Sequence, residues 1–132
     1  MSAGLREAIA TLRRDDGEYP VPESLRSVFH GIADALAAED FAFQDNPIAG
    51  VRPIDASTAE HIRACINAYG DQLVPLDAST WTRARYGWDS DSVWAFIVDL
   101  STSREAVSDL ALHAKLHADP IPEFEIWSVH VP

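Results

Sequence analysis

Histidine and cysteine side chains supply the first candidates for chemistry. His113 and His117 are four residues apart, and His61 precedes Cys65 by the same interval. On a helix this spacing brings two side chains to one face, where paired imidazoles bind a metal ion or an imidazole activates a thiol. On a strand, four residues span about 13 Å, which is too far for two ligands of one ion. The chemistry of each pair therefore depends on the element that carries it.

Neither pair predicts a metal centre or a catalytic residue. We expect His113 and His117 on a strand, and they lack the glutamate of the His-Glu-x-x-His zinc pattern. We expect Cys65, the single cysteine, to be a small buried residue on the apolar side of a helix, because free cysteine is among the most buried residue types. The alternative, in which His61 activates the Cys65 thiol, is retained. The sequence thus predicts no metal, no cofactor and no catalytic residue.

Two acidic clusters have the residue types of acid–base catalysis or of Mg²⁺ binding. Asp15, Asp16 and Glu18 form one cluster, and Glu39 and Asp40 form the other. Both fall at expected helix ends, with neither a partner histidine nor a glycine-rich phosphate loop to complete a site. We interpret them as solvated turn residues. The sequence therefore favours a protein that is not an enzyme.

Trp88 is the clearest candidate for contact with a partner. It falls in a predicted hairpin loop over residues 87–91, among polar neighbours, where a large indole is hard to bury. Tryptophan is enriched among the residues that dominate protein interfaces. We therefore predict partner-binding residues at Trp88, Asp89 and Asp91, and we expect Trp94 in the core. The alternative is that Trp88 is a core residue as well.

The charge of the chain limits the class of partner. It has 21 acidic and 10 basic residues, a formal net charge of −11, and the acidic excess is spread along the whole length. Nucleic-acid backbones and anionic membranes select clustered Lys and Arg, so we predict neither as a partner. A basic protein would be attracted and its encounter steered. The alternative is that the acidity only keeps a small domain soluble.

Targeting signals are not expected. Residues 1–7 have neither the apolar core nor the cleavage site of a signal peptide. The longest apolar run, at residues 94–98, is far shorter than the ~20 residues that a membrane span needs. A single cysteine is consistent with a reducing compartment. We therefore expect a cytoplasmic protein.

The order of the apolar patterns predicts the fold class. Helix-period stripes occupy the first half of the chain, and short runs rich in Trp, Phe, Ile and Val follow. We predict a single α+β domain over residues 1–132, in which three N-terminal helices pack on a four-stranded antiparallel β-meander. The expected helices are residues 3–14, 23–39 and 58–69, and the expected strands are residues 80–86, 92–100, 107–117 and 123–131.

Residues 103–117 fit two kinds of element. Thr102 and Glu105 resemble a helix capping box, whereas the apolar residues from Leu110 to Leu116 alternate as in a strand. We favour the strand because the alternation is unbroken and both neighbouring segments have strand patterns. A hairpin to the last strand then predicts a register with Lys115 opposite Glu125, His117 opposite Glu123, His113 opposite Trp127, Leu116 opposite Phe124 and Ala114 opposite Ile126.

Several segments resemble a family of small uncharacterised bacterial domains. They are the runs Gly50-Val51-Arg52-Pro53-Ile54-Asp55, Tyr69-Gly70, Leu73-Val74, Thr80-Trp81, Val98-Asp99-Leu100, Ser108-Asp109-Leu110 and Phe124-Glu125-Ile126-Trp127-Ser128-Val129-His130-Val131-Pro132. The resemblance covers residues 20–132 and implies a strand at the Ser108 segment, but no activity. The predicted order of helices and sheet is also similar, as a fold-level analogy, to immunity proteins of bacterial toxin systems and to cystatin-type or nuclear-transport-factor-type cones.

These observations support two functional hypotheses. The first is a non-catalytic protein-binding module, in its narrower form an immunity-type inhibitor of a basic toxin, because the chain is small, acidic and without a catalytic set. The second is a cone-shaped small-molecule-binding protein or enzyme, with a pocket lined by Tyr69, Trp94, Phe96 and Trp127. A large internal cavity would favour the second hypothesis, and a filled core would favour the first.

Overall fold

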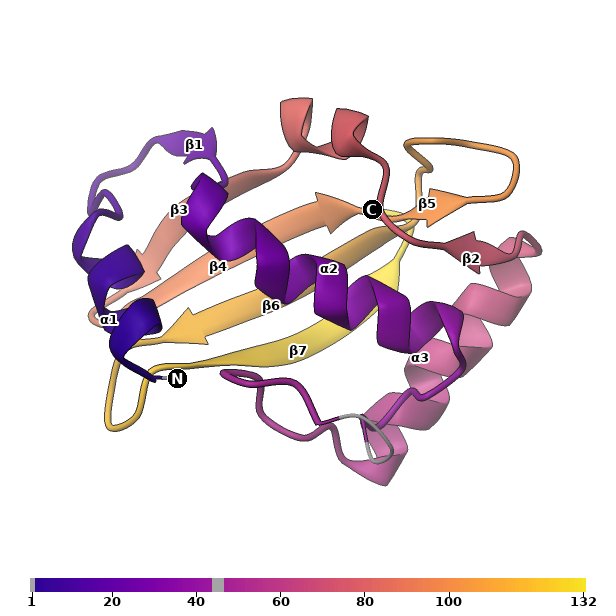
Figure 1. Ribbon diagram of the computed structural model, residues 1–132, viewed down its shortest axis with the longest axis horizontal. Coiled ribbons are helices and arrows are strands. Elements are labelled where there is room, and N and C mark those ends of the chain that lie inside the picture. The colour runs from indigo at the N-terminus through magenta and orange to yellow at the C-terminus, as the bar shows by residue number, and fades with distance from the viewer. Residues whose placement is uncertain (1, 44–46) are drawn as a thin grey trace.

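The computed structural model describes residues 2–43 and 47–132, and it is an α+β fold with one main antiparallel sheet (Figure 1). The helices are α1 (Ser2–Ala10), α2 (Glu23–Ala37) and α3 (Ala56–Tyr69), followed by a 3-10 helix at Ala78–Thr82. The strands are β1 (Glu18–Pro20), β2 (Leu73–Val74), β3 (Arg85–Ser90), β4 (Val93–Asp99), β5 (Ser101–Thr102), β6 (Ala111–His117) and β7 (Glu123–His130). The main sheet has the order β1-β3-β4-β6-β7, and β2 pairs separately with β5.

The helix α2 packs across one face of the main sheet (Figure 1). Its apolar stripe consists of the buried residues Leu25, Phe29, Ile32 and Leu36. Phe29 reaches the aromatic side chains of the sheet, with its ring centroid 5.6 Å from that of Phe96 and 5.1 Å from that of Phe124. The Phe29–Phe96 pair is tilted and the Phe29–Phe124 pair is edge-to-face, and such ring contacts add to the burial of apolar area. This aromatic cluster is the centre of the core.

The sheet supplies the other half of the core through alternate residues of its strands. The side chains buried under the helices are Trp94, Phe96, Val98, Leu112, Ala114, Leu116, Phe124, Ile126 and Val129. Each points to the same face because side chains on paired strands alternate with a period of two. The space between α2 and the sheet is therefore filled by large apolar groups. No helix in the described part of the chain is long and apolar enough to cross a lipid bilayer.

The predicted arrangement of three helices followed by a four-stranded meander is wrong. The main sheet has a fifth strand, β1, which lies between α1 and α2 in the chain and sets Tyr19 opposite Tyr86 of β3. Helices and strands also alternate later in the chain. The strand β2 follows α3 and pairs with β5 in a separate two-stranded sheet. Because β1 has three residues and ends at Pro20, it is too short for an alternating pattern to be recognised in the sequence, and its proline fits an edge strand.

The first predicted strand, over residues 80–86, is mostly a different element. Asp77 caps a 3-10 helix by accepting a hydrogen bond from the Ser79 amide at 2.9 Å, and the helix runs to Thr82. The strand β3 starts only at Arg85 and continues to Ser90. It therefore takes in most of the segment that the sequence predicts as a hairpin loop. Other ends differ as well, since α1 stops at Ala10 and β6 starts at Ala111.

The preference for a strand within residues 103–117 is confirmed by β6. Thr102 does accept a hydrogen bond from the Glu105 amide at 3.0 Å, but this bond closes a turn rather than a helix. The register with β7 agrees with the prediction for four pairs, Ala114–Ile126, Lys115–Glu125, Leu116–Phe124 and His117–Glu123. His113, however, lies opposite Ser128 rather than Trp127, because the pairing shifts by one residue at a β-bulge.

Candidate functional site

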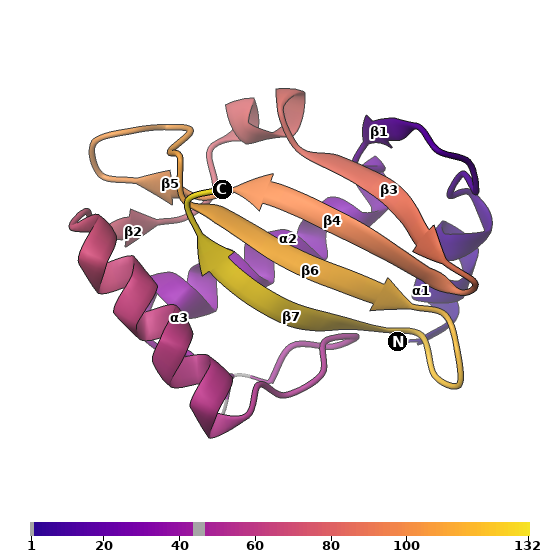
Figure 2. The same ribbon diagram turned by 180° about the vertical axis from the view of Figure 1, so that it is seen from behind.

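One face of the main sheet is left uncovered by the helices. Figure 2 shows β4, β6 and β7 from this side with no helix in front of them. We call it the open face. Ile97 on β4 and Trp127 on β7 project from it, and they are 40% and 54% exposed. Two large apolar side chains on one uncovered sheet surface are a feature of contact sites for other molecules.

The charged side chains of the open face are bound to one another. Lys115 Nζ lies 3.0 Å from Asp89 Oδ2, linking β6 to β3. Arg52, from the loop beside β7, lies 2.9 Å from Glu123 and 3.3 Å from Glu125. Further along the sheet, two more pairs are Arg83–Asp99 at 3.1 Å and His117–Glu125 at 2.9 Å. The negative charges of these acids are therefore largely balanced by the basic side chains that bind them.

A shallow groove of about 280 Å³ runs along the open face between these pairs. The large apolar and polar side chains that line the groove are Ile97, His113, Lys115, Trp127, Ser128 and His130. The Lys115 ammonium lies 4.1 Å from the centroid of the Trp127 ring, a cation–π contact. The rings of His113 and His130 are stacked nearly parallel, with centroids 4.2 Å apart. We call this set the open-face groove.

Burial changes the proton affinity of the groups around the groove. Burial lowers the pKa of His113, and the nearby His130 lowers it further, so the neutral imidazole is favoured. The Nε2 atom of His113 is buried without a hydrogen-bond partner in the described part of the chain. Burial raises the pKa of Asp99, against the opposing effect of Arg83. Burial would also raise the pKa of Glu125, but hydrogen bonds from His117 and Trp127 outweigh it and the pKa is lowered.

The arrangement does not form a recognisable catalytic or metal centre. Ser128 Oγ lies 2.9 Å from His130 Nδ1, but His130 stacks on the His113 ring, and among the described residues no carboxylate orients it. Among residues 2–43 and 47–132, no three His, Cys, Asp or Glu side chains are arranged to hold one metal ion. His117 is bound to Glu125, away from the stacked pair.

The structure separates the predicted partner-binding residues Trp88, Asp89 and Asp91. Trp88 lies on β3 rather than in a loop, opposite Trp94, and therefore on the helix-covered face. It stands near the end of that face, is 37% exposed, and donates from Nε1 to the Asp91 carbonyl oxygen at 3.0 Å. Asp89 points the other way and binds Lys115. Asp91 begins the two-residue turn before β4, with φ of 38°.

Acidic side chains gather where this hairpin meets β1. A hollow of about 230 Å³ there has Asp16, Glu18 and Asp89 on its walls, together with Arg85. The Arg85 guanidinium donates to the carbonyl oxygens of Thr82 and Ala84, at 3.0 and 2.8 Å. We call the set Asp16, Glu18, Trp88, Asp89 and Asp91 the hairpin surface. The sequence predicts Trp88, Asp89 and Asp91 as partner-binding residues. Asp16 and Glu18 lie beside them only because β1 pairs with β3.

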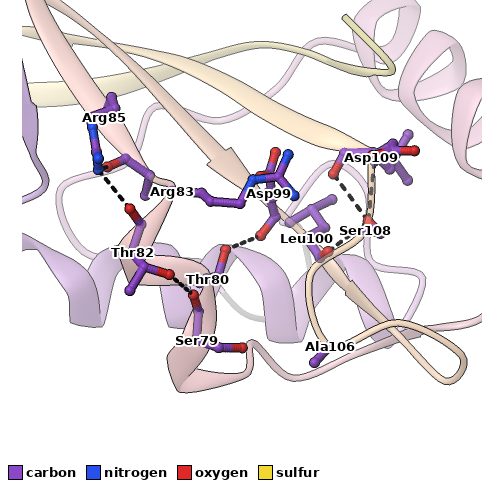
Figure 3. Close-up of polar contacts among 12 residues, drawn as sticks. Ser79, Thr80, Thr82, Arg83, Arg85, Asp99, Leu100, Ala106, Ser108 and Asp109 are labelled. Atoms are coloured by element: carbon purple, nitrogen blue, oxygen red, sulfur yellow. Dashed lines mark hydrogen bonds and ion pairs between the residues drawn. The ribbon is translucent and has the colours of Figure 1, made fainter.

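A group of hydroxyls lies at the other end of β4, and its role is structural. The buried Thr80 donates from Oγ1 to the Asp99 carbonyl at 2.6 Å, and the buried Ser108 donates to the Leu100 carbonyl at 2.6 Å (Figure 3). Ser101 donates likewise to the Ala106 carbonyl at 2.6 Å. Buried hydroxyls that satisfy backbone carbonyls fix irregular segments in place. These residues hold the 3-10 helix and the loop after β5 against the sheet.

Cys65 is less buried than the sequence predicts. It is half-buried on α3, and its Sγ lies 3.7 Å from His61 Nε2. The buried stripe of this helix is formed by Ala59, Ile62 and Ile66, and Cys65 stands at its margin. The alternative of a thiol beside an imidazole is therefore present in the geometry, although among the described residues no third group binds His61 to complete a catalytic site.

The four residues of the predicted internal pocket do not share a cavity. Trp94 and Phe96 are buried under the helices, whereas Trp127 projects from the open face. Tyr69 lies on α3, and its hydroxyl donates to Glu105 at 2.6 Å. A larger hollow, of about 530 Å³, lies between α1, α2 and residues 49–50, outside the layer between helix and sheet. A filled core was the outcome expected of a binding module rather than of a small-molecule cone.

Comparison with known proteins places the chain in a family. Neither the curated proteins nor the solved structures yield a match to it. One family model matches residues 33–132, from the second half of α2 to the C-terminal residue. The match includes the whole open face but leaves out α1 and β1. The resemblance to an uncharacterised family is thus confirmed, and the chain belongs to the family DUF7668, a domain of unknown function.

Proposed function

We propose that this chain is a non-catalytic protein-binding module that binds a basic protein through the hairpin surface. The observation that carries the proposal is the grouping of Asp16, Glu18 and Asp89 around one hollow. The same hairpin carries the partly exposed Trp88, which faces the other side of the sheet, and the turn residue Asp91. Carboxylates beside a tryptophan fit a partner that offers Lys or Arg next to an apolar surface.

Charge supports a basic partner at two distances. At long range, a chain with a formal net charge of −11 attracts a basic protein and raises the rate of encounter. At contact, each exposed ion pair contributes little, about 0–1 kcal/mol, because water and salt screen it. Several carboxylates around one hollow therefore make binding specific and speed the association with the partner. Trp88 supplies apolar area for the contact.

The narrower form of this proposal is an immunity-type inhibitor of a basic toxin. Such a role needs a small, acidic and stable domain. It inhibits its partner by binding to it rather than by catalysing a reaction. The filled space between α2 and the sheet, and the absence of a catalytic arrangement among the described residues, support this form over a cone-shaped small-molecule binder or enzyme.

Photo-crosslinking from the hairpin surface tests the proposal. A photoreactive phenylalanine analogue replaces Ser90, which is exposed between two acids of the hairpin, and a control chain carries the analogue at the exposed Ala64 of α3. Cross-linked proteins are identified by mass spectrometry, produced in pure form and titrated against the unmodified chain by calorimetry. We expect a protein with an isoelectric point above about 9 that cross-links from position 90 and not from position 64.

Two substitutions then separate a specific surface from a general attraction. Asp91→Asn keeps the backbone carbonyl that Trp88 uses and suits the positive φ of this position, whereas Asp34→Asn removes one charge from an exposed site on α2. We expect Asp91→Asn to weaken binding several-fold and Asp34→Asn to leave it within twofold. A partner that is not basic, or equal effects of the two substitutions, would refute the proposal.

A further inference from the structure

The middle of the open face differs in charge from the rest of the molecule. Four bases and four acids lie on β3, β4, β6 and β7 or bind to side chains of these strands, so this four-stranded part of the face carries no net charge. Glu18 of β1 adds one acid at the edge of the face. The bases are Arg52, Arg83, Arg85 and Lys115, and the acids are Asp89, Asp99, Glu123 and Glu125. The formal charge of −11 therefore belongs to the remainder of the chain.

From this pattern we infer that the open-face groove is a self-association surface, on which a second copy of the chain packs face to face. A basic partner has little to gain around the groove, because Glu123 and Glu125 are already bound to Arg52, and Asp99 to Arg83. Another copy meets no repulsion there, although it is repelled by the rest of the surface. The inference goes beyond the proposed function, which uses the acidic hairpin surface. Ala95 and Ile97 line both the groove and the hollow of that surface, whereas Trp127 lines the groove and not the hollow.

The apolar side chains of the groove supply the attraction. Ile97 and Trp127 stand on β4 and β7, at either side of the histidine stack on β6 and β7. In a two-fold symmetric pair each patch meets its own copy, so these two side chains cover the groove of the opposite chain. Antiparallel sheets commonly bury such a face by packing on a second sheet about 10 Å away. In the described part of the chain, no helix or second sheet covers the open face (Figure 2).

The size of the surface sets the strength of the association. Four strands about 4.8 Å apart and seven residues long cover roughly 19 by 23 Å, or about 450 Å² on each copy. The total of about 900 Å² is below the range of about 1,200–2,000 Å² that stable complexes bury. The association is therefore weak and reversible, and it becomes visible only at high protein concentration.

Sedimentation equilibrium of the purified chain tests the inference without any partner. The chain is measured from about 10 μM to about 1 mM, at 50 and 500 mM NaCl. We expect the apparent mass to rise from one chain toward two with concentration. We also expect more dimer at 500 mM NaCl, because salt screens the repulsion between copies of charge −11 while the apolar contact persists. A monomer under every condition would overturn the inference.

Matched isoleucines locate the surface. Ile97→Glu places a charge in the groove, and Ile121→Glu places the same charge on an exposed isoleucine in the loop before β7; the two residues are 40% and 62% exposed. We expect the dissociation constant of the dimer to rise at least tenfold for Ile97→Glu and to stay within twofold for Ile121→Glu. Trp127→Ser, at a 54% exposed position, is the second variant if Ile97→Glu impairs folding in a thermal melt.

Two results would show that another surface is used. They are a dimer that survives both Ile97→Glu and Trp127→Ser in folded protein, and a dimer that weakens equally with Ile121→Glu. Asp91→Asn, which tests the binding of a basic partner, should leave the dimer unchanged, because Asp91 lies in the turn outside the groove. The self-association and the proposed function can therefore fail separately.

Discussion

Replacing Trp94 and Trp88 in turn by alanine tests how the β3–β4 hairpin packs. The two residues lie opposite each other on the helix-covered face, but Trp94 is fully buried and Trp88 is 37% exposed. Truncation of a buried tryptophan costs about 3–5 kcal/mol. Trp94 also donates from Nε1 to the Arg13 carbonyl at 3.0 Å, and a hydrogen bond of this kind contributes about 1 kcal/mol. We expect Trp94→Ala to lower the free energy of unfolding by about 5 kcal/mol.

The cost at Trp88 follows from its partial burial. A tryptophan side chain buries about 200 Å² when it is fully covered, so a residue that is 37% exposed buries about 125 Å². At about 25 cal/mol per Å² this area corresponds to about 3 kcal/mol, and compactness of the unfolded chain reduces it to about 2 kcal/mol. We therefore expect Trp88→Ala to cost about 2 kcal/mol, more than a surface substitution and less than a core truncation.

Urea denaturation followed by far-ultraviolet circular dichroism measures both free energies. A Trp88→Ala variant within about 0.5 kcal/mol of the natural chain would show that the indole does not pack on the helix-covered face. Equal losses for the two variants would show that Trp88 is as central as Trp94. Trp94→Phe keeps an aromatic ring but removes the N–H donor to Arg13, so its smaller loss reports the hydrogen bond and the difference in ring size.

Other measurements test the open face and α3. Burial and His130 lower the pKa of His113, so the unfolded chain, with a pKa near 6.5, takes up this proton more readily than the folded protein. The stability contributed by neutral His113 is complete above about pH 6.5 and is lost as the pH falls from there through the folded pKa. His113→Phe should flatten this slope in unfolding free energies measured from pH 5 to 8, and an unchanged slope would contradict the assignment. Cys65 is half-buried beside His61, so a thiol reagent should label the native protein without denaturant; labelling only in urea would show that the thiol is inaccessible. His113 and His117 lie on one strand with different partners, so equimolar Zn²⁺ should leave the Tm unchanged, and a rise of several degrees would mean that they share a metal.

The parts of the fold that the sequence predicts are those with a repeated signal. The stripe of α2 from Leu25 to Leu36 gives a helix and its buried face without further information. The alternation from Leu110 to Leu116, together with opposite charges at Lys115 and Glu125, gives a strand and its register. In each case several residues indicate the same element. Local secondary-structure preference and the pattern of burial then predict one structure.

Elements held by a few backbone contacts are not predicted. The strand β1 has three residues, and pairing with β3 is what orders it, so its own residues show no periodic pattern. Because β1 is missed, Asp16 and Glu18 are not placed beside Asp89, and the hairpin surface is only partly predicted. Trp88 is misplaced for a related reason. The polar residues around it are typical of a loop, but pairing with β4 extends β3 to Ser90 and leaves a two-residue turn.

The groove on the open face originates in one residue of β7. Up to Ile126 the apolar side chains of this strand stand at even positions, but the next buried one is Val129. A strand cannot bury both sets on one face unless an extra residue is inserted, and here Trp127 and Ser128 together oppose His113. Without the bulge, regular alternation would turn Val129 to solvent and His130 into the core. With it, His130 turns to the open face and stacks on His113, beside Trp127, which projects from this face under either arrangement. The change of parity between Ile126 and Val129 is visible in the sequence, and it is the signal from which the open-face groove was predictable.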